Sequence, residues 1–178
     1  GPLSHRYGSP RDLVLGVTLV LGDGTVASSG GKVVKNVAGY DLGKLVCGSE
    51  GRLALIARVS LRLHPLPAAA ATLVVETDDP AGVVRALRRS QHQPSALDVH
   101  HPGRVGVLFE GRDGAVSAQM DAAYALVGGA PGDVSIWHEA RERQARALGR
   151  LAFAPGDLSN VLSTLSSAVV RPAAGIAY

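Results

Sequence analysis

The stretch SGGKVVKNVAGYDLGKLVCGSEGRLALIARVSLRLHPLP, residues 29–67, decides the fold of this chain. Its glycines at positions 30, 31, 39, 48 and 51 mark places where the backbone bends sharply or approaches another group closely. Residues 48–51 (GSEG) follow an expected short helix over 38–47 and precede an expected strand over 53–63. Such a turn offers backbone N–H groups to an anion or to the edge of a heterocycle. From the residues alone, a set of turns that only shapes the fold is an equally good interpretation.

Towards the N-terminus the pattern predicts a β-hairpin. Residues 13–21 (LVLGVTLVL) form a continuous apolar run, Gly22-Asp23-Gly24 suits a tight turn, and residues 25–27 return. Residues 28–32 are expected to be a glycine-rich break. Residues 22–27 also fit a GxGxxA dinucleotide pattern. The sequence that follows them is unlike a helix, so the hairpin is the preferred interpretation.

Towards the C-terminus, residues 64–67 and the alanines after them are expected to be a linker. Beyond it the pattern indicates a β-α-β-β-α-β order, typical of a ferredoxin-like layer of helices on an antiparallel sheet. The expected elements are a strand at 72–77, a helix at 80–91 capped by Asp79, strands at 95–100 and 105–110, a helix at 113–127 and a strand at 134–137. A helix at 138–148, a strand at 151–153, a helix at 157–168 and a last strand would begin another unit. The predicted fold class is α+β.

Composition excludes several classes of protein. With 46% hydrophobic and 19% charged residues among 178, the chain is too apolar for intrinsic disorder. Its longest apolar run is about half of a membrane span. The net charge of +3 and 4% aromatic content argue against a nucleic-acid partner. The single cysteine, Cys47, excludes a disulfide scaffold and suits a buried apolar thiol. A cytoplasmic protein is therefore expected.

No catalytic or metal-binding set can be assigned from spacing. His100 and His101 are adjacent, and neighbouring residues of a strand point to opposite faces, so the two side chains are not expected to share a metal. No catalytic residue is named, and no metal site is expected. Lys32, Lys35 and Lys44 are the basic residues most worth testing, with solvated surface charges as the plainer interpretation.

The glycine-rich stretch also carries a family resemblance. The segment GGKVVKNVAGYDLGKL at 30–45, followed by GSEGRLALI at 48–56, closely resembles the flavin domain of the vanillyl-alcohol-oxidase/PCMH superfamily. Within that superfamily it is most similar to the FAD-binding E subunits of bacterial glycolate oxidases. The resemblance is strong over residues 3–67. It is weaker afterwards, where Ile136-Trp137 and Arg141-Glu142 resemble a tryptophan-containing helix of the family's cap domain.

The resemblance implies a fold and a function. Residues 1–67 would be the C-terminal part of a PCMH-type FAD-binding domain, and residues 68–178 an incomplete α+β cap domain. The chain would then be a fragment that lacks the N-terminal half of the FAD domain. The implied cofactor is FAD, and the implied reaction is oxidation of a 2-hydroxy acid to a 2-oxo acid. Implied partners are a homologous FAD-binding subunit and an iron–sulfur subunit, through which the cytoplasmic protein would associate with a membrane.

Two alternatives stay open at this point. One is a non-catalytic assembly subunit that keeps the flavin fold, and the other is a stand-alone FAD-linked oxidase of another alcohol. Arg52 replaces the family's usual Thr and Ala54 its usual Gly, which puts the close backbone approach after Gly51 in doubt. Carried over from the family, the cofactor-binding residues would be Asn36, Gly39, Tyr40 and Asp41 beside the flavin, Gly48, Ser49 and Gly51 near the pyrophosphate and ribose, and Ile56 on the adenine side.

Overall fold

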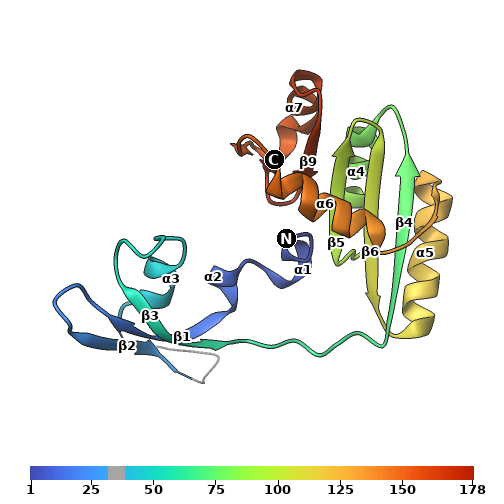
Figure 1. Cartoon of the computed structure of the whole chain (residues 1–178). Coiled ribbons are helices and arrows are strands. Elements are labelled where there is room, and N and C mark those ends of the chain that lie inside the picture. The colour runs from blue at the N-terminus through green and yellow to red at the C-terminus, as the bar shows by residue number, and fades with distance from the viewer. Residues whose placement is uncertain (32–38) are drawn as a thin grey trace. The chain divides into compact units, whose positions relative to one another are not determined.

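The computed structural model describes residues 1–31 and 39–178, which form two compact units (Figure 1). The smaller unit is Gly8–Pro65, and the larger unit combines Gly1–Tyr7 with Leu66–Tyr178. Asn36, Lys32 and Lys35 lie outside the described residues. Among the described residues, no helix has both the length and the apolar character needed to cross a bilayer.

The smaller unit is built on a three-stranded antiparallel sheet in the order β2-β1-β3. Its strands are β1 (Val14–Val20), β2 (Val26–Gly30) and β3 (Leu55–Leu61). The predicted hairpin is confirmed, and its turn is braced by Asp23, whose carboxylate accepts the Thr25 N–H at 2.9 Å. The expected break at 28–32 is partly wrong, because residues 28–30 continue β2 and pair with β1.

Two short helices, α2 (Pro10–Leu13) and α3 (Leu42–Val46), accompany this sheet. α3 is shorter than the expected 38–47, and it begins where the side chain of Asp41 accepts the Lys44 N–H at 3.0 Å. Its Val46 packs against Val17 and Leu19 of β1 and against Ala54. Among the described residues of this unit, these four buried side chains make up the core.

The larger unit contains a seven-stranded sheet in the order β7-β4-β6-β5-β9-β10-β8. From Ala69 onward, six elements follow the predicted β-α-β-β-α-β order, but the last strand lies at 130–132 and not at the predicted 134–137. The four strands among them lie as β7-β4-β6-β5, all antiparallel. The expected linker over 69–71 is wrong, because these alanines belong to a strand that pairs with residues 109–111. The six elements are β4 (Ala69–Glu76), α4 (Pro80–Arg89), β5 (Ala96–His101), β6 (Arg104–Gly111), α5 (Asp113–Val127) and β7 (Ala130–Gly132).

The remaining elements differ more from expectation. The strand expected at 134–137 is wrong, because helix α6 (Ser135–Ala145) begins there and buries Ile136, Trp137 and Ala140 at helical spacing. The helix expected over residues 157–168 ends at 164, and Ala168, its expected last residue, begins a strand with the β-branched pair Val169-Val170. The other elements are α1 (Ser4–Tyr7), β8 (Leu151–Ala152), η1 (Pro155–Asp157), α7 (Leu158–Thr164), β9 (Ala168–Arg171) and β10 (Ile176–Ala177).

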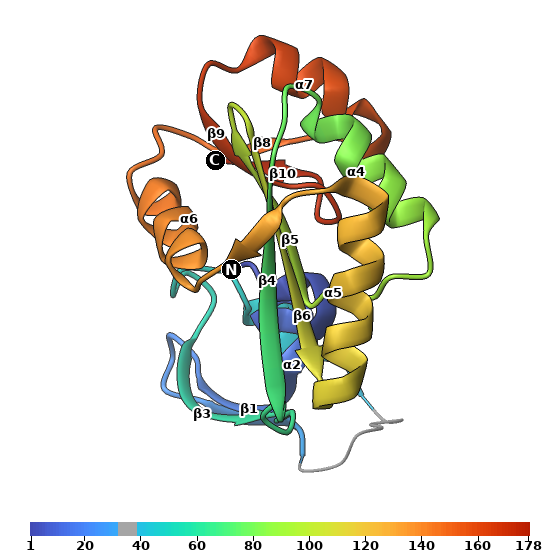
Figure 2. The ribbon, with the colours of Figure 1, turned by 90° about the vertical axis from the view of Figure 1, so that its right-hand side faces the viewer.

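The two faces of the large sheet differ in chemistry. Helices α4 and α5 cover one face and α6 covers the other (Figure 2). Side chains alternate along the strands, so Leu97 and Val99 of β5 enter the main apolar core on the α4/α5 face. Asp98 and His100 of the same strand then face α6, together with Arg171 of β9. We call this second surface the α6 face.

Candidate functional site

Residues 48–51 form a loop in which three of the four backbone N–H groups make no hydrogen bond to any described residue. The φ angles of Gly48, Glu50 and Gly51 are +87°, +55° and +77°. Within the part of the chain that the structure describes, the N–H groups of these three residues donate no hydrogen bond. A Cβ on Gly48 or Gly51 would meet no atom within 4 Å. Backbone N–H groups without a protein partner can bind an anion.

The rest of this loop is held by its own backbone. Ser49 donates its N–H to the carbonyl of Val46 at 3.0 Å, and Arg52 donates its N–H to the carbonyl of Ser49 at 3.0 Å. Glu50 and Arg52 make an exposed ion pair at 3.6 Å, so the one carboxylate in the loop is partly compensated. The loop is therefore preformed in its open shape.

Gly39, Tyr40 and Asp41 lie just before α3. Gly39 has a φ of +81°, and a Cβ there would again meet open space. The Tyr40 side chain is 89% exposed, and its carbonyl accepts the hydroxyl of Ser29 at 2.7 Å. Hydrogen bonding to the Lys44 N–H lowers the pKa of Asp41, and the same carboxylate pairs with the Lys44 ammonium at 3.1 Å. Asp41 is thus occupied as the cap of α3, while the tyrosine ring is free to contact a ligand.

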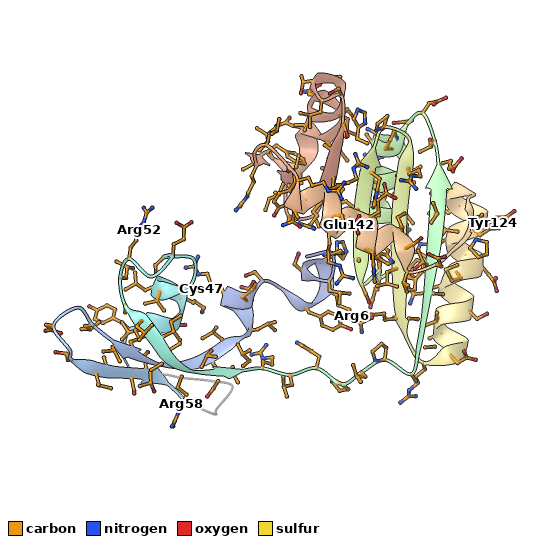
Figure 3. All side chains as sticks on the ribbon, viewed as in Figure 1. Arg6, Cys47, Arg52, Arg58, Tyr124 and Glu142 are labelled. Atoms are coloured by element: carbon orange, nitrogen blue, oxygen red, sulfur yellow. The ribbon has the colours of Figure 1, made fainter. Side chains whose placement is uncertain are left out.

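The two departures from the family pattern leave the loop open. Ala54 is 8% exposed and its methyl group packs in the small core, away from the N–H groups of the loop. Arg52 extends into solvent from the loop, as Figure 3 shows. Ile56, expected on the adenine side, lies on β3 and is 46% exposed. None of these side chains occupies the space in front of Gly48 and Gly51.

The α6 face of the larger unit holds a second group of polar residues. Asp98 is 1% exposed, its nearest cationic partner is Arg171 with Nε at 3.7 Å, and neither carboxylate oxygen has a hydrogen-bond partner among the described residues. Burial raises the pKa of Asp98 to about 6, against the opposing effect of Arg171. Arg171 in turn donates to the Gln144 side chain at 2.7 Å and stacks on the Tyr178 ring.

His100 and Glu139 are neighbours on the same face. His100 is fully buried, and its Nδ1 lies 3.8 Å from a Glu139 oxygen. Burial lowers the pKa of His100 to about 4, so the ring is neutral at ordinary pH. Glu139 accepts two hydrogen bonds from Arg104, at 2.6 and 2.7 Å. Burial alone would raise the pKa of Glu139, but these bonds together with the charges of Arg104, His100 and Arg143 outweigh burial and lower the pKa.

The structure separates the two histidines as the strand pattern predicted. His101 points to the other face, where its Nε2 contacts the carbonyl of Leu165 at 2.8 Å. No three His, Cys, Asp or Glu side chains gather as a possible metal site among residues 1–31 and 39–178. Cys47 is a half-buried free thiol. Asp98 and His100 are close together in the sequence. Glu139, Arg104 and Arg171 could not be linked to them from the sequence, because only strand pairing and the packing of α6 bring these residues together.

Comparisons with known proteins relate the chain to flavin-dependent oxidoreductases. It is 34% identical over 146 residues to glycolate oxidase subunit GlcE of Escherichia coli, covering 81% of this chain and 40% of the relative. It is 33% identical over 114 residues to glycolate oxidase subunit GlcD of Bacillus subtilis, covering 57% and 24%. It is 47% identical over 65 residues to a D-lactate dehydrogenase of Archaeoglobus fulgidus, covering 36% and 15%. No protein-family model matches the chain.

Solved structures show the same fold. Two crystal forms of an alkyldihydroxyacetonephosphate synthase match with TM-scores of 0.59 and 0.66, at 20% and 17% identity. They cover 79% and 90% of this chain, and 33% and 41% of the synthase. The expected α+β architecture is thereby confirmed. The chain spans about two fifths of the length of its glycolate oxidase relative, and less of the others.

Proposed function

We propose that this chain, a homologue of FAD-linked oxidoreductases such as glycolate oxidase subunits and D-lactate dehydrogenases, is the flavin-binding part of an enzyme that oxidises a 2-hydroxy acid to a 2-oxo acid. The sequence identity with these relatives supports the class of reaction. In this proposal residues 1–67 belong to the FAD-binding domain and residues 68–178 to an α+β cap domain.

The open loop at 48–51 is the observation that carries the proposal. The N–H groups of Gly48, Glu50 and Gly51 donate to no described residue, and the diphosphate of FAD is an anion that such groups can bind. Ser49 would add its hydroxyl near the ribose. The free Tyr40 ring and Gly39 would border the flavin, and the exposed Ile56 would contact the adenine side.

The chain's residues would supply binding and orientation. FAD, when bound, accepts the hydride that a 2-hydroxy acid loses on becoming a 2-oxo acid. The loop N–H groups would hold the cofactor's negative charge without reorganising, because the loop is already fixed by the bonds of Ser49 and Arg52. Asp41 would act indirectly, by holding the start of α3 beside Tyr40.

We further propose that electrons leave through partner subunits in the cytoplasm. The relatives are named as two different glycolate oxidase subunits, which supports a complex with a homologous FAD-binding subunit. An iron–sulfur subunit, and membrane association through it, rest on the family resemblance alone. Arg52 and Ala54 do not support a non-catalytic assembly role, because neither side chain lies within 4 Å of a Cβ built on Gly48 or Gly51.

Titration of the chain with FAD, followed by flavin fluorescence, tests the proposal. We expect weak saturable binding, with a Kd on the order of 100 µM. Gly51→Ala should weaken it at least tenfold, because a residue with a Cβ at a φ of +77° shifts the loop and redirects its N–H groups.

Gly24→Ala is the matched control. Gly24 also has a positive φ, +85°, and open space around its Cα, but it lies in the turn between β1 and β2. This variant should bind FAD like the wild type. Equal affinity in all three proteins, or no saturable binding, would contradict the proposed role of the loop.

A further inference from the structure

We infer that a basic groove on the larger unit is a docking surface for an extended acidic segment of a partner protein. The groove lies between helix α4 and the start of α7, and it has a volume of about 330 Å³. We call it the α4 groove. Helix α4 covers the face of the large sheet opposite α6 (Figure 2). All residues of the groove belong to the larger unit, so the inference goes beyond the proposed flavin loop.

The base of the α4 groove is part of the main apolar core. Ala81 and Val84 of α4 and Leu158 of α7 line the groove, and all three are buried. They belong to a single core cluster. Close packing in that cluster holds the two walls of the groove together. The groove is therefore formed before any partner binds.

Three arginines of α4 give the groove its charge. Arg85, Arg88 and Arg89 are exposed, and no ion pair or hydrogen bond joins their guanidinium groups to a described residue. Spacings of three and four residues place them on one face of the helix. No acidic side chain is among the described residues that line the groove. Asp157, which is next to the groove in the sequence, makes no ion pair with any described residue.

The dipole of α4 accounts for only part of this charge. Arg88 and Arg89 lie in the last turn of the helix, where positive charge is stabilising. Arg85 lies before that turn, and like charges three and four residues apart destabilise a helix. The charge of Arg88 also acts beyond α4, because burial and then this charge lower the pKa of His5. The repulsion among the three arginines would be relieved by an anion from outside the described residues.

The spacing of the arginines favours an acidic segment over a single small anion. An α-helix rises about 1.5 Å per residue, so Arg85 and Arg89 are about 6 Å apart along the axis of α4. In an extended segment, side chains two residues apart point the same way and are separated by about 7 Å. Each planar guanidinium group can donate two parallel hydrogen bonds to a carboxylate. Acidic residues at alternate positions would therefore meet successive arginines.

Fluorescence anisotropy tests the inference with a short rhodamine-labelled peptide that carries glutamate at alternate positions. Titration of this peptide with the full chain should show saturable binding that weakens as salt is raised. The double variant Arg85→Gln/Arg89→Gln should bind the peptide at least tenfold more weakly. Its melting temperature should not fall below that of the wild type, because both side chains are exposed and without a partner among the described residues.

The double variant Arg146→Gln/Arg150→Gln is the matched control. It removes the same charge, at the same spacing in the sequence, from two other exposed arginines of the larger unit. Neither of them lines the α4 groove. The control should bind the glutamate peptide like the wild type, since general attraction of a negative peptide to a positive protein would be weakened equally in both variants.

Four results would overturn the inference: no saturable binding of the glutamate peptide, equal binding of the same peptide with glutamine in place of glutamate, equal loss in the control variant, or displacement of the peptide by inorganic phosphate at an equal concentration. The last result would show a site for a small anion. FAD titration of Arg85→Gln/Arg89→Gln separates this inference from the proposed function. Unchanged FAD affinity is expected, and its loss would contradict a surface that is distinct from the flavin loop.

Discussion

At the scale of residues, Asp98 and His100 on the α6 face respond to pH in opposite directions. Burial raises the pKa of Asp98 from 3.8 to about 6, so its contribution to stability is full below pH 3.8 and is lost as pH rises through 6. Burial lowers the pKa of His100 from 6.5 to about 4, so its contribution is full above pH 6.5 and is lost as pH falls through 4. Between these limits the two effects offset each other.

Single substitutions should therefore separate the two pH dependences of stability, one from Asp98 and one from His100. In Asp98→Asn the histidine effect remains, and the melting temperature should rise with pH between about 4 and 6. In His100→Gln the aspartate effect remains, and the melting temperature should fall over the same interval. Thermal melts by circular dichroism measure both. If each variant keeps the pH profile of the wild type, the assigned pKa directions are wrong.

Gly30 is required by both conformation and space. Its φ is +74°, and a Cβ there would collide with the carbonyl oxygen of Leu15 on the neighbouring strand. Gly30→Ala should lower the free energy of unfolding of the smaller unit by about 2 kcal/mol or more. Gly24→Ala, with positive φ but open space, should cost about 1 kcal/mol. Urea unfolding compares the two variants. Equal losses of unfolding free energy would show that β1 and β2 can move apart to accommodate a side chain at residue 30.

Some residues of the sites were predictable from the sequence, and others were not, for a physical reason. Gly48 and Gly51 were predictable as sharp bends because glycine tolerates positive φ, and both have it. The positive φ of Glu50 was not predictable, because its residue type disfavours that region. Arg171 lies beside Asp98 only because strand β9 pairs with strand β5, which no local spacing reveals.

At the scale of elements, helix α6 packs on its sheet at a glycine. A Cβ on Gly106 of β6 would lie 3.0 Å from Ile136 Cδ1 and 3.2 Å from a ring carbon of Trp137. Gly106→Ala should therefore overpack this contact and cost about 1–3 kcal/mol in unfolding free energy. It should also weaken the bond from Trp137 Nε1 to the Thr72 hydroxyl, now 3.0 Å.

Gly111→Ala is the control on the same strand, since a Cβ there meets only Val116 at an ordinary 3.9 Å. Chemical denaturation, with tryptophan fluorescence as the probe, measures both variants, because Trp137 is the single tryptophan of the chain. Equal stability of the two variants would mean that α6 is free to shift away from the sheet.

Local sequence pattern predicted some elements correctly and others wrongly. Helix α4 was predicted with Asp79 as its N-cap, and the structure confirms the cap, because the side chain of Asp79 accepts a hydrogen bond from the Gly82 N–H at 2.8 Å. The start of α6 was misassigned as a strand because residues 134–137 are β-prone over a short window. Burial of Ile136, Trp137 and Ala140 against the sheet decides for helix. Tertiary packing outweighed local propensity there.

At the scale of the whole molecule, the two units should differ in stability. Among the described residues, the core of the smaller unit has four buried side chains, whereas the core cluster of the larger unit holds eighteen. Fewer buried apolar contacts allow local opening at lower free energy. Amide hydrogen exchange should therefore be faster in β1 than in β5 and β6. Slower exchange in β1 would contradict this difference.

The central claim is that the N–H groups of the 48–51 loop hold the diphosphate of FAD, and amide resonances report on it directly. In a two-dimensional ¹H–¹⁵N NMR titration with FAD, the amides of Gly48, Glu50 and Gly51 should shift and saturate together. The amides of Gly22 and Gly24 in the hairpin turn should stay unchanged. Saturating shifts at other residues with none in the loop, or no shifts at all, would contradict the claim.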